Sequence, residues 1–228
     1  MPRTRAVVFD LDDTLYPESA YVRSGFRAVA AEAARRYGVA ADEAYAELER
    51  MFEEGVRGDT FDRWLKSRGI DGDVADLVAA YRAHEPTIEP FPEAPSLLER
   101  LRAQGYLLGL LSDGEPEIQY GKLDAIGLRD AFDATLVSGE LGRDAWKPSP
   151  RGLLALAERL GVEPSEAVYV SDNPAKDFKA ARDAGMRSIR VRREGGVYSH
   201  LEPECADYAP DIEAESLAAA AEALGTRD

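Results

Sequence analysis

The sequence predicts an α/β fold: a doubly wound, mostly parallel, Rossmann-like sheet with an inserted all-helical domain. The runs at residues 6–10, 106–112 and 167–171 are apolar almost without interruption, which is typical of strands buried on both faces. Helical patterns lie between these runs, and alternation of strands and helices favours a parallel sheet. Residues 17–87 break the alternation because they contain no convincing strand.

Strands and helices are expected in turn along the rest of the chain. The further strands expected are residues 134–137, 187–191 and the short run 206–208. The expected helices are residues 94–104, 150–160, 175–184 and 213–224. The first three of these helices are followed by glycine, which is favoured just beyond a helix C-terminus.

The segment without strands is predicted to form a separate helical domain. Apolar side chains recur there at helical spacing, for example Ala44, Leu48 and Met51. The expected helices are residues 19–37, 41–54, 61–67 and 74–84. Four prolines between residues 85 and 95 indicate a stiff return to the sheet domain. The predicted core is therefore residues 1–16 and 89–228, and the predicted insert is residues 17–88.

Composition and charge restrict the partners of the protein. The 228 residues include 28 Lys and Arg against 43 Asp and Glu, a net charge of −15. This charge disfavours nucleic acid and anionic membranes as partners. The single cysteine, Cys205, excludes an intrachain disulfide and fits a reducing compartment. We expect a cytoplasmic protein, monomeric or homodimeric, that binds a small molecule and neither nucleic acid nor a membrane.

Polar residues follow the apolar runs expected at the centre of the sheet. Ligands of open α/β sheets bind beyond the carboxyl ends of the strands, so these polar residues form the candidate site. They are Asp10, Asp12, Asp13 and Thr14 after the first run, Ser112 and Asp113 after the second, Lys147 in a later loop, and Asp172, Asn173 and Asp177 after the run 167–171.

The charges of these residues indicate what the site holds. Four carboxylates and one ammonium would share the crevice, those of Asp10, Asp12, Asp172, Asp177 and Lys147. Two carboxylates about 4 Å apart repel by on the order of 4 kcal/mol at an effective dielectric of about 20, and a cation can offset that repulsion. Mg²⁺ suits a site that combines carboxylates, waters and a substrate phosphate. Ser112, the backbone N–H groups after it and Lys147 are then phosphate donors.

The run Asp10-Leu11-Asp12-Asp13-Thr14 resembles the DxDxT signature of the haloacid dehalogenase superfamily, in its phosphatase branch. Ser112 matches the second motif of that family, Lys147 the third, and the pair Asp172 and Asp177 the acidic fourth. The helical insert resembles the cap of the subgroup whose helical cap follows the first strand. The resemblance spans essentially the whole chain and implies a Mg²⁺-dependent phosphatase that hydrolyses a small phosphorylated metabolite.

The resemblance also implies a role for each matched residue. Asp10 would attack phosphorus and form an aspartyl-phosphate, and Asp12 would act as general acid and then as general base. Mg²⁺ would be held by Asp10, the backbone carbonyl of Asp12, and Asp172. The supporting residues would be Asp177 and Asn173 around the metal, and Thr14, Ser112, Asp113 and Lys147 around the phosphoryl group. The cap would close over the site and select the substrate.

Other interpretations of the same residues stay open. A haloacid dehalogenase attacks carbon and needs neither Mg²⁺ nor an acid at Asp12, and a phosphosugar mutase shares all four motifs. A phospho-acceptor resembling receiver domains would place its aspartate after a later strand and lack the insert. Some of these residues also have structural interpretations, among them Asp13 as a solvated or turn residue, Thr14 as a turn cap, and Asn173 as the N-cap of a helix that starts at Pro174. The sequence does not name the substrate.

Overall fold

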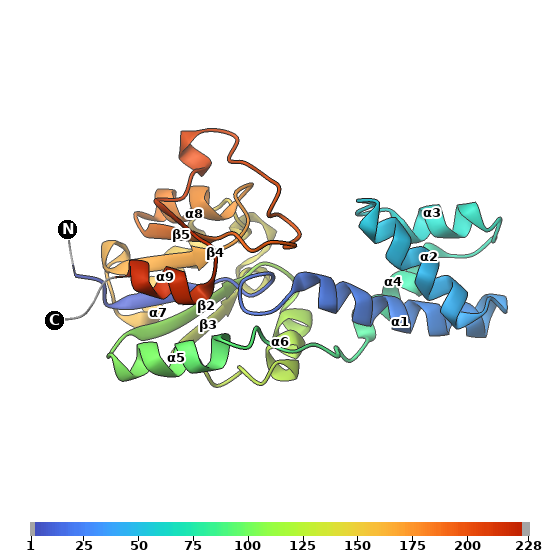
Figure 1. The fold of residues 1–228 in the computed structure, drawn as a ribbon, viewed down its shortest axis with the longest axis horizontal. Helices are drawn as coiled ribbons and strands as arrows, with labels where there is room; N and C mark the ends of the chain where they lie inside the picture. Colours follow the sequence, from blue (N-terminus) through green and yellow to red (C-terminus); the bar gives the residue numbers. More distant parts are fainter. Residues whose placement is uncertain (1–2, 225–228) are drawn as a thin grey trace. The chain divides into compact units, whose positions relative to one another are not determined.

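A six-stranded parallel sheet forms the centre of the computed structural model, which describes residues 3–224 (Figure 1). The strands lie in the order β3-β2-β1-β4-β5-β6, and every neighbouring pair is parallel. Their bounds are β1 Ala6–Phe9, β2 Leu107–Ser112, β3 Ala134–Val137, β4 Ala167–Ser171, β5 Arg187–Val191 and β6 Ile212–Ala214. The strand order reverses at β1, and ligands of such sheets bind at the point of reversal.

The register of the central strands brings the candidate residues to one edge. Phe9 of β1 pairs with Leu110 of β2 and with Val170 of β4. The residues that follow these three therefore meet at the carboxyl edge of the sheet. The predicted α/β class and the parallel sheet are confirmed.

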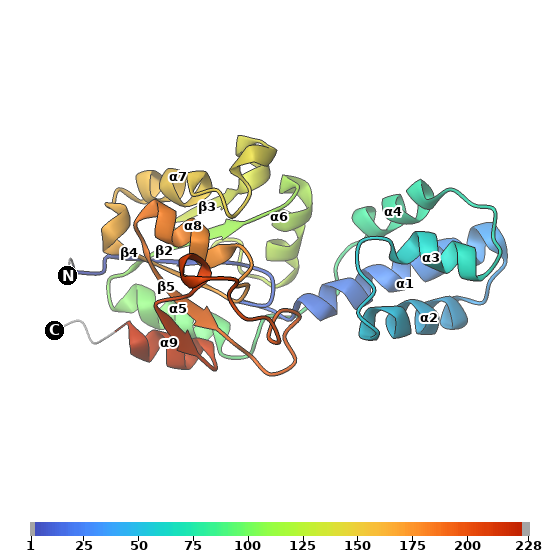
Figure 2. The same ribbon diagram turned by 90° about the horizontal axis from the view of Figure 1, so that it is seen from above.

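Helices cover both faces of this sheet (Figure 2). On one face, α7 (Arg151–Leu160) packs on β2 and β3, and α8 (Asp177–Ala184) packs on β4 and β5. On the other face, α5 (Ala94–Ala103) packs on β2, and α9 (Leu217–Ala223) packs on β5 and β6. Buried apolar side chains, including Val8, Leu111, Leu156 and Tyr169, fill the layer beneath α7 and α8.

The C-terminal part of the sheet differs from the sequence prediction. Residues 206–208 form a short 3₁₀ helix, and the edge strand is β6 at Ile212–Ala214. The last helix begins at Leu217 and not at the expected residue 213. A three-residue edge strand carries no readable apolar pattern, and β6 exists because it pairs with β5. Ser216 caps α9 by accepting a hydrogen bond from the N–H of Ala219, which fixes the later helix start.

Two helices near the site also differ from prediction. Helix α6 (Pro116–Ala125) was not predicted, although Pro116 stands at its first turn as helix starts favour. Helix α8 begins at Asp177 and not at the expected Ala175. Asn173 is therefore not its N-cap: its side chain accepts from the N–H of Ala175 at 2.9 Å and forms a turn before the helix.

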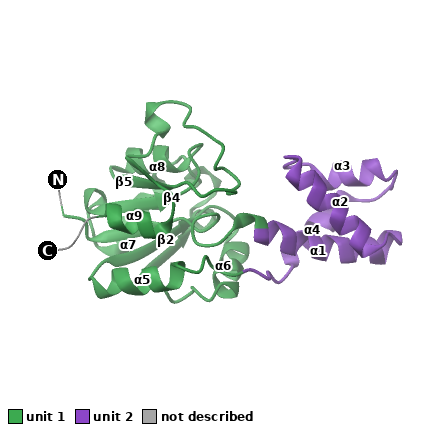
Figure 3. Cartoon of the chain, in the orientation of Figure 1, with its two compact units in different colours: residues 1–19, 89–228 green, residues 20–88 purple. Residues whose placement is uncertain are grey.

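The chain divides into two compact units, residues 1–19 with 89–228, and residues 20–88 (Figure 3). The first boundary was expected between residues 16 and 17, and residues 1–2 and 225–228 of the predicted core lie outside the described part. The second unit contains most of α1 and three further helices: α1 Glu18–Tyr37, α2 Ala41–Glu53, α3 Thr60–Ser67 and α4 Val74–Ala83.

The second unit has an aromatic core of its own. Phe26 contacts Phe52, Phe61 and Tyr81 with ring centroids about 6 Å apart, as edge-on and tilted aromatic pairs do. Trp64 is fully buried and donates to Glu47 at 2.9 Å. Within residues 3–224, no helix has the length and apolarity that crossing a bilayer requires.

Candidate active site

The loop after β1 turns sharply and keeps Asp10 at the end of the strand. The Asp10 N–H donates to the carbonyl of Val170 at 2.9 Å, which continues the pairing with β4. The Leu15 N–H donates to the carbonyl of Leu11 at 2.9 Å and closes the turn. Asp13 has φ +52°, the left-handed region that aspartate tolerates better than most residues.

Asp13 is a turn residue, which was one of the two sequence interpretations, and it is buried, not solvated as the other interpretation had it. Its side chain accepts from the N–H of Glu18 at 2.8 Å and from the N–H of Val197 at 2.5 Å. Residue Asp13 is only 5% exposed. The sequence pattern could not show this because Val197 lies far along the chain. Asp13 thus fastens the start of α1 and the loop after β5 to the candidate site.

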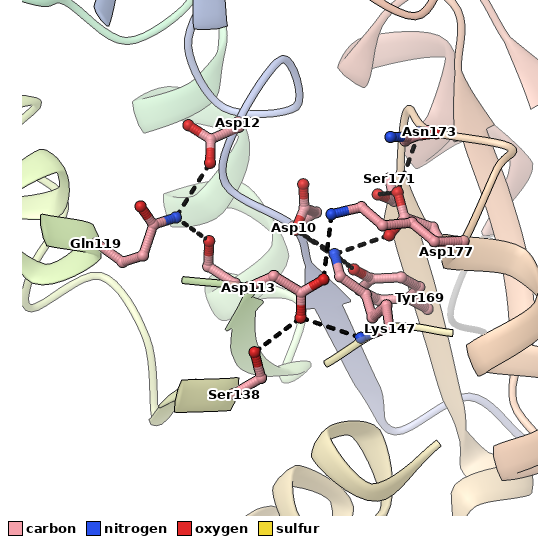
Figure 4. Close-up of polar contacts among 12 residues, drawn as sticks. Asp10, Asp12, Asp113, Gln119, Ser138, Lys147, Tyr169, Ser171, Asn173 and Asp177 are labelled. Atoms are coloured by element: carbon pink, nitrogen blue, oxygen red, sulfur yellow. Dashed lines mark hydrogen bonds and ion pairs between the residues drawn. The ribbon is translucent and has the colours of Figure 1, made fainter. Parts of the chain in front are cut away.

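Lys147 lies at the centre of a buried polar cluster (Figure 4). Its Nζ contacts Asp10 Oδ1 at 2.7 Å, Asp177 Oδ1 at 2.7 Å and the Tyr169 hydroxyl at 2.8 Å. Burial disfavours the ammonium, but the Asp10 and Asp177 carboxylates outweigh it and raise the Lys147 pKa well above its ordinary value. Lys147 therefore stays charged and fixes one oxygen of Asp10.

Three buried carboxylates, those of Asp10, Asp172 and Asp177, have oxygen atoms within 4.8 Å of one another. Burial raises the pKa of Asp10 to about 6, because Lys147 offsets it only in part and Asp177 adds repulsion. Burial, then the charges of Asp177 and Asp10, raise the Asp172 pKa well above its ordinary value. A hard divalent cation with oxygen ligands offsets repulsion of this kind, so the residues present fit one.

Within this carboxylate cluster, Asp177 already has protein partners on both oxygens. Oδ1 contacts Lys147 at 2.7 Å, and Oδ2 accepts from the Ser171 hydroxyl at 2.6 Å and from the Asn173 N–H at 3.1 Å. These contacts favour an orienting task for Asp177, with Asp10 and Asp172 as the direct ligands. That division, and the supporting task of Asn173, stay predictions.

A buried arginine holds the backbone of Asp172. Arg190 on β5 has no exposed surface, and its Nε donates to the Asp172 carbonyl at 3.1 Å. Its Nη2 donates to the carbonyls of Tyr198 at 3.1 Å and Leu201 at 2.9 Å. Arg190 therefore joins the loop after β4 to the loop after β5. The sequence prediction missed it, because an arginine in a short strand reads as an exposed residue.

The Asp12 carboxylate turns toward Gln119 of α6 (Figure 4). Gln119 Nε2 donates to its Oδ2 at 3.0 Å, Lys122 Nζ donates to its Oδ1 at 2.7 Å, and the Tyr16 hydroxyl also donates to Oδ1. Burial opposes ionisation, but the Lys122 charge and the hydrogen bonds from Lys122, Tyr16 and Gln119 outweigh it and lower the Asp12 pKa. Asp12 is therefore an anion held by α6.

The two predicted phosphate-binding hydroxyls are both buried. Ser112 is 1% exposed, and its oxygen accepts from Gln119 Nε2, so its own proton is left for another acceptor. The Thr14 hydroxyl has no hydrogen-bond partner among the described residues. A phosphate contact from Ser112 fits this geometry, and one from Thr14 stays a prediction.

The Asp113 side chain does not suit phosphate binding. Its Oδ1 accepts from the Ser138 hydroxyl at 2.8 Å and the Lys147 N–H at 3.2 Å, and its Oδ2 contacts Lys176 Nζ at 3.1 Å. Burial opposes ionisation, but the charges of Lys147 and Lys176 outweigh it and lower the Asp113 pKa. An anion so placed repels phosphate, so only the backbone N–H of Asp113 keeps the predicted role.

Several site residues had no sequence prediction: Gln119, Lys122, Tyr169, Lys176, Arg190 and Glu18. Gln119 and Lys122 are three residues apart and so share one face of α6, a signal that is readable only once that helix is recognised. Glu18 faces Asp12 and Asp13. Burial and then the charges of those two residues raise its pKa to about 8.

The whole chain is similar to known hydrolases. A family model described as haloacid dehalogenase-like hydrolase matches residues 4–185. The chain is 36% identical over 219 residues to the glyceraldehyde 3-phosphate phosphatase of Methanopyrus kandleri, covering 92% of each chain. It is 34% identical over 169 residues to the phosphoserine phosphatase of Thermus thermophilus, covering 74% of this chain and 61% of the relative. The crystal structure of an HAD phosphatase from Thermococcus onnurineus superposes with a TM-score of 0.66 at 30% identity, covering 98% and 99% of the two chains.

Proposed function

The chain belongs to the haloacid dehalogenase-like hydrolases as a phosphoric monoester hydrolase, and we propose that Asp10 is the nucleophile with which it cleaves a small phosphomonoester. One observation carries this proposal: Asp10 ends the central strand beside Asp172, with Oδ1 fixed by the Lys147 ammonium at 2.7 Å. Its other oxygen, Oδ2, is then directed by that contact and can attack phosphorus.

The chemistry divides into two steps. In the first, the bond from Asp10 Oδ2 to phosphorus forms as the bond to the leaving alcohol breaks. Asp12, which is ionised in the free protein, must first take up a proton from water before it can give one to that alcohol. In the second, water attacks the phosphorus of the aspartyl-phosphate. Asp12 takes the proton from that water, and Asp10 is released together with inorganic phosphate. Lys147 and Ser112 neutralise and orient the phosphoryl group, where most of the catalytic effect lies.

Asp10, Asp172 and the backbone carbonyl of Asp12 would hold Mg²⁺, which when bound supplies positive charge beside the transferring phosphoryl group. Asp177, which contacts Lys147 and Ser171, would hold Lys147 in position, and Lys147 would in turn hold Asp10. Burial and the repulsion from neighbouring carboxylates, which together raise the Asp10 and Asp172 pKa values, support a cation at this place. We further expect residues 20–88 to act as the cap that selects the substrate.

The chemistry of two relatives ranks the substrates to test. Glyceraldehyde 3-phosphate and phosphoserine, the substrates in the names of these relatives, are both three-carbon phosphomonoesters. We therefore propose a small phosphomonoester of this size, ahead of nucleotides and larger sugar phosphates. Two controls test the alternative activities: a 2-haloacid as a dehalogenase substrate, and a hexose phosphate followed for isomer formation.

The deciding experiment is phosphate release from a panel of these compounds with Mg²⁺. We expect turnover of a three-carbon phosphomonoester, loss of turnover with EDTA, and recovery on adding Mg²⁺. Halide release that persists in EDTA would instead support a dehalogenase. Isomer formation without phosphate release would support a mutase.

A further inference from the structure

Three lysine ammonium groups lie at a site whose chain carries a net charge of −15. Lys122 contacts Asp12 at 2.7 Å, Lys147 contacts Asp10 and Asp177 at 2.7 Å, and Lys176 contacts Asp113 at 3.1 Å. Only Lys147 was expected from the sequence. The contacts of the other two decide whether either is available to a phosphoryl group.

Lys147 is surrounded by protein partners. Its Nζ donates hydrogen bonds to Asp10 and to the Tyr169 hydroxyl, and it lies 2.7 Å from Asp177 Oδ1 as an ion pair. Its side chain is 1% exposed. Two of the three ammonium protons are therefore engaged in protein hydrogen bonds, one of which orients the nucleophile.

Lys176 is placed differently. Its side chain is 34% exposed, and among the described residues its Nζ has one hydrogen-bond acceptor, Asp113 Oδ2. Its charge acts on Asp10, Asp177 and Lys147, so the ammonium stands within Coulombic range of the nucleophile. Two of its protons remain for an incoming anion.

Asp113 fixes the position of this second ammonium. The carboxylate is itself held by the Ser138 hydroxyl and the Lys147 N–H, on the oxygen that Lys176 does not contact (Figure 4). Asp113 follows β2 and is held by residues that follow β3. Through its Oδ2 it fixes the ammonium of Lys176, which lies in the loop before α8. The carboxylate that cannot bind phosphate instead orients a group that can.

We propose that Lys176, oriented by Asp113, binds the transferring phosphoryl group and is a second cationic catalytic residue of this site. The proposal rests on the proposed phosphatase function and adds to it. Lys147 then orients Asp10, while Lys176 supplies hydrogen bonds to the phosphoryl oxygens. The competing explanation is structural: Lys176 would only neutralise the buried charge of Asp113.

The first test compares Lys176→Met, Lys176→Arg and the control Lys179→Met, whose lysine lies on α8 and pairs with Asp183. Loss of a charged hydrogen bond predicts a fall in kcat/KM of about 10- to 100-fold for Lys176→Met. The inhibition constant for inorganic phosphate should rise with it. Lys176→Arg keeps the charge and donors and should restore most of the activity, and the control should match wild type. Unchanged kcat/KM and phosphate inhibition in Lys176→Met would overturn the proposal.

A double variant separates catalysis from charge neutralisation. If Lys176 only neutralises Asp113, combining Asp113→Asn with Lys176→Met removes the charge to be neutralised and should recover activity. If Lys176 binds the phosphoryl group, the double variant should stay as impaired as Lys176→Met, and recovery would overturn the proposal. Should wild type turn over no phosphomonoester, the proposed function fails. Calorimetry with inorganic phosphate and Mg²⁺ then decides the Lys176 proposal: weaker binding by Lys176→Met supports it, and equal binding overturns it.

Discussion

Asp10 and Asp12 stand two positions apart in one turn, and their surroundings shift their pKa values in opposite directions. Burial and the nearby Asp177 raise the Asp10 pKa to about 6 although Lys147 contacts it. Burial acts on Asp12 as well, but the Lys122 charge and the hydrogen bonds from Lys122, Tyr16 and Gln119 lower its pKa. Two carboxylates separated in this way suit different tasks. The Lys122 charge and hydrogen bonds outweigh burial at Asp12, whereas Lys147 offsets burial at Asp10 only in part.

Asp10→Asn removes the proposed nucleophile and should have the greatest effect. We expect turnover of the preferred phosphomonoester to fall by roughly 10⁴-fold or more, as loss of a nucleophile does in other hydrolases. Phosphate release with Mg²⁺ measures it, and circular dichroism checks the fold. Asp183→Asn, on the exposed side of α8, is the matched control. Substantial activity in Asp10→Asn would refute the nucleophile assignment.

Asp12→Asn tests the second carboxylate alone. Proton transfer by a positioned acid contributes about 10²- to 10⁴-fold, so an alkyl phosphate should lose activity in that range. A phosphate ester of 4-nitrophenol needs little protonation of its leaving group, so its first step should be less affected. The ratio of the two losses, measured by single-turnover kinetics, is the readout. Equal losses for both substrates would argue against an acid role.

Lys122→Met would remove the ammonium that lowers the Asp12 pKa and so distinguishes the surroundings of Asp12 from those of Asp10. Breaking a buried ion pair leaves Asp12 uncompensated, and we expect the free energy of unfolding at pH 7 to fall by about 3 kcal/mol. The Asp12 pKa lies below its ordinary 3.8 in the folded protein, so its stabilisation is present above that pH and lost as the pH falls through the lowered value.

The loss of unfolding free energy in Lys122→Met should therefore become smaller at acid pH, when Asp12 takes up a proton. Urea unfolding in EDTA, at neutral pH and near about pH 4, measures this change. Lys179→Met, which breaks an exposed pair on α8, should cause no measurable change at either pH. A deficit that stayed constant with pH would mean that Lys122 stabilises the protein through packing of its side chain.

Glu18→Gln should give the smallest change, with the opposite dependence on pH. The Glu18 pKa is raised from 4.5 to about 8. The protonated Glu18 side chain therefore contributes its full stability below pH 4.5, and this contribution is lost as the pH rises through about 8. The variant has nothing to ionise. It should match wild type at acid pH and exceed it by about 2 kcal/mol above pH 8, with the partial exposure of Glu18 limiting the gain.

Urea unfolding in EDTA at both pH values tests the Glu18 effect. Glu99→Gln on the exposed side of α5 is the control and should follow wild type throughout. If the stability difference between Glu18→Gln and wild type were the same at every pH, the raised pKa of the Glu18 carboxyl group would be disproved.

The sequence was sufficient for five of the six strands and for the polar residues at the ends of the central ones. Asp10, Ser112 and Asp172 each follow an apolar run directly, so local pattern and the geometry of parallel sheets together place them at one edge. The edge strand β6 could not be predicted, since three residues that pair with β5 carry no local signal.

The partners of the site residues depend on tertiary structure. Gln119 and Lys122 reach Asp12 only because α6 stands beside the first loop, and the Val197 N–H meets Asp13 across the fold. Lys176 and Asp113 show the same limit. Each sits next to a recognised motif residue, but which of the two can serve phosphate follows from their mutual contact and not from their positions in the chain.

The central place of β1 has a consequence for synthesis of the protein. This strand is made first, yet its neighbours β2 and β4 are made only after the whole helical unit and, for β4, most of the remaining core. Long sequence separation between contacting elements slows folding, and domains fold as units during translation. The helices of residues 20–88 can fold early, whereas Asp10 must leave the ribosome well before Lys147 and Asp172 exist. The residues of the candidate site therefore come together only after much of the last third of the chain has emerged.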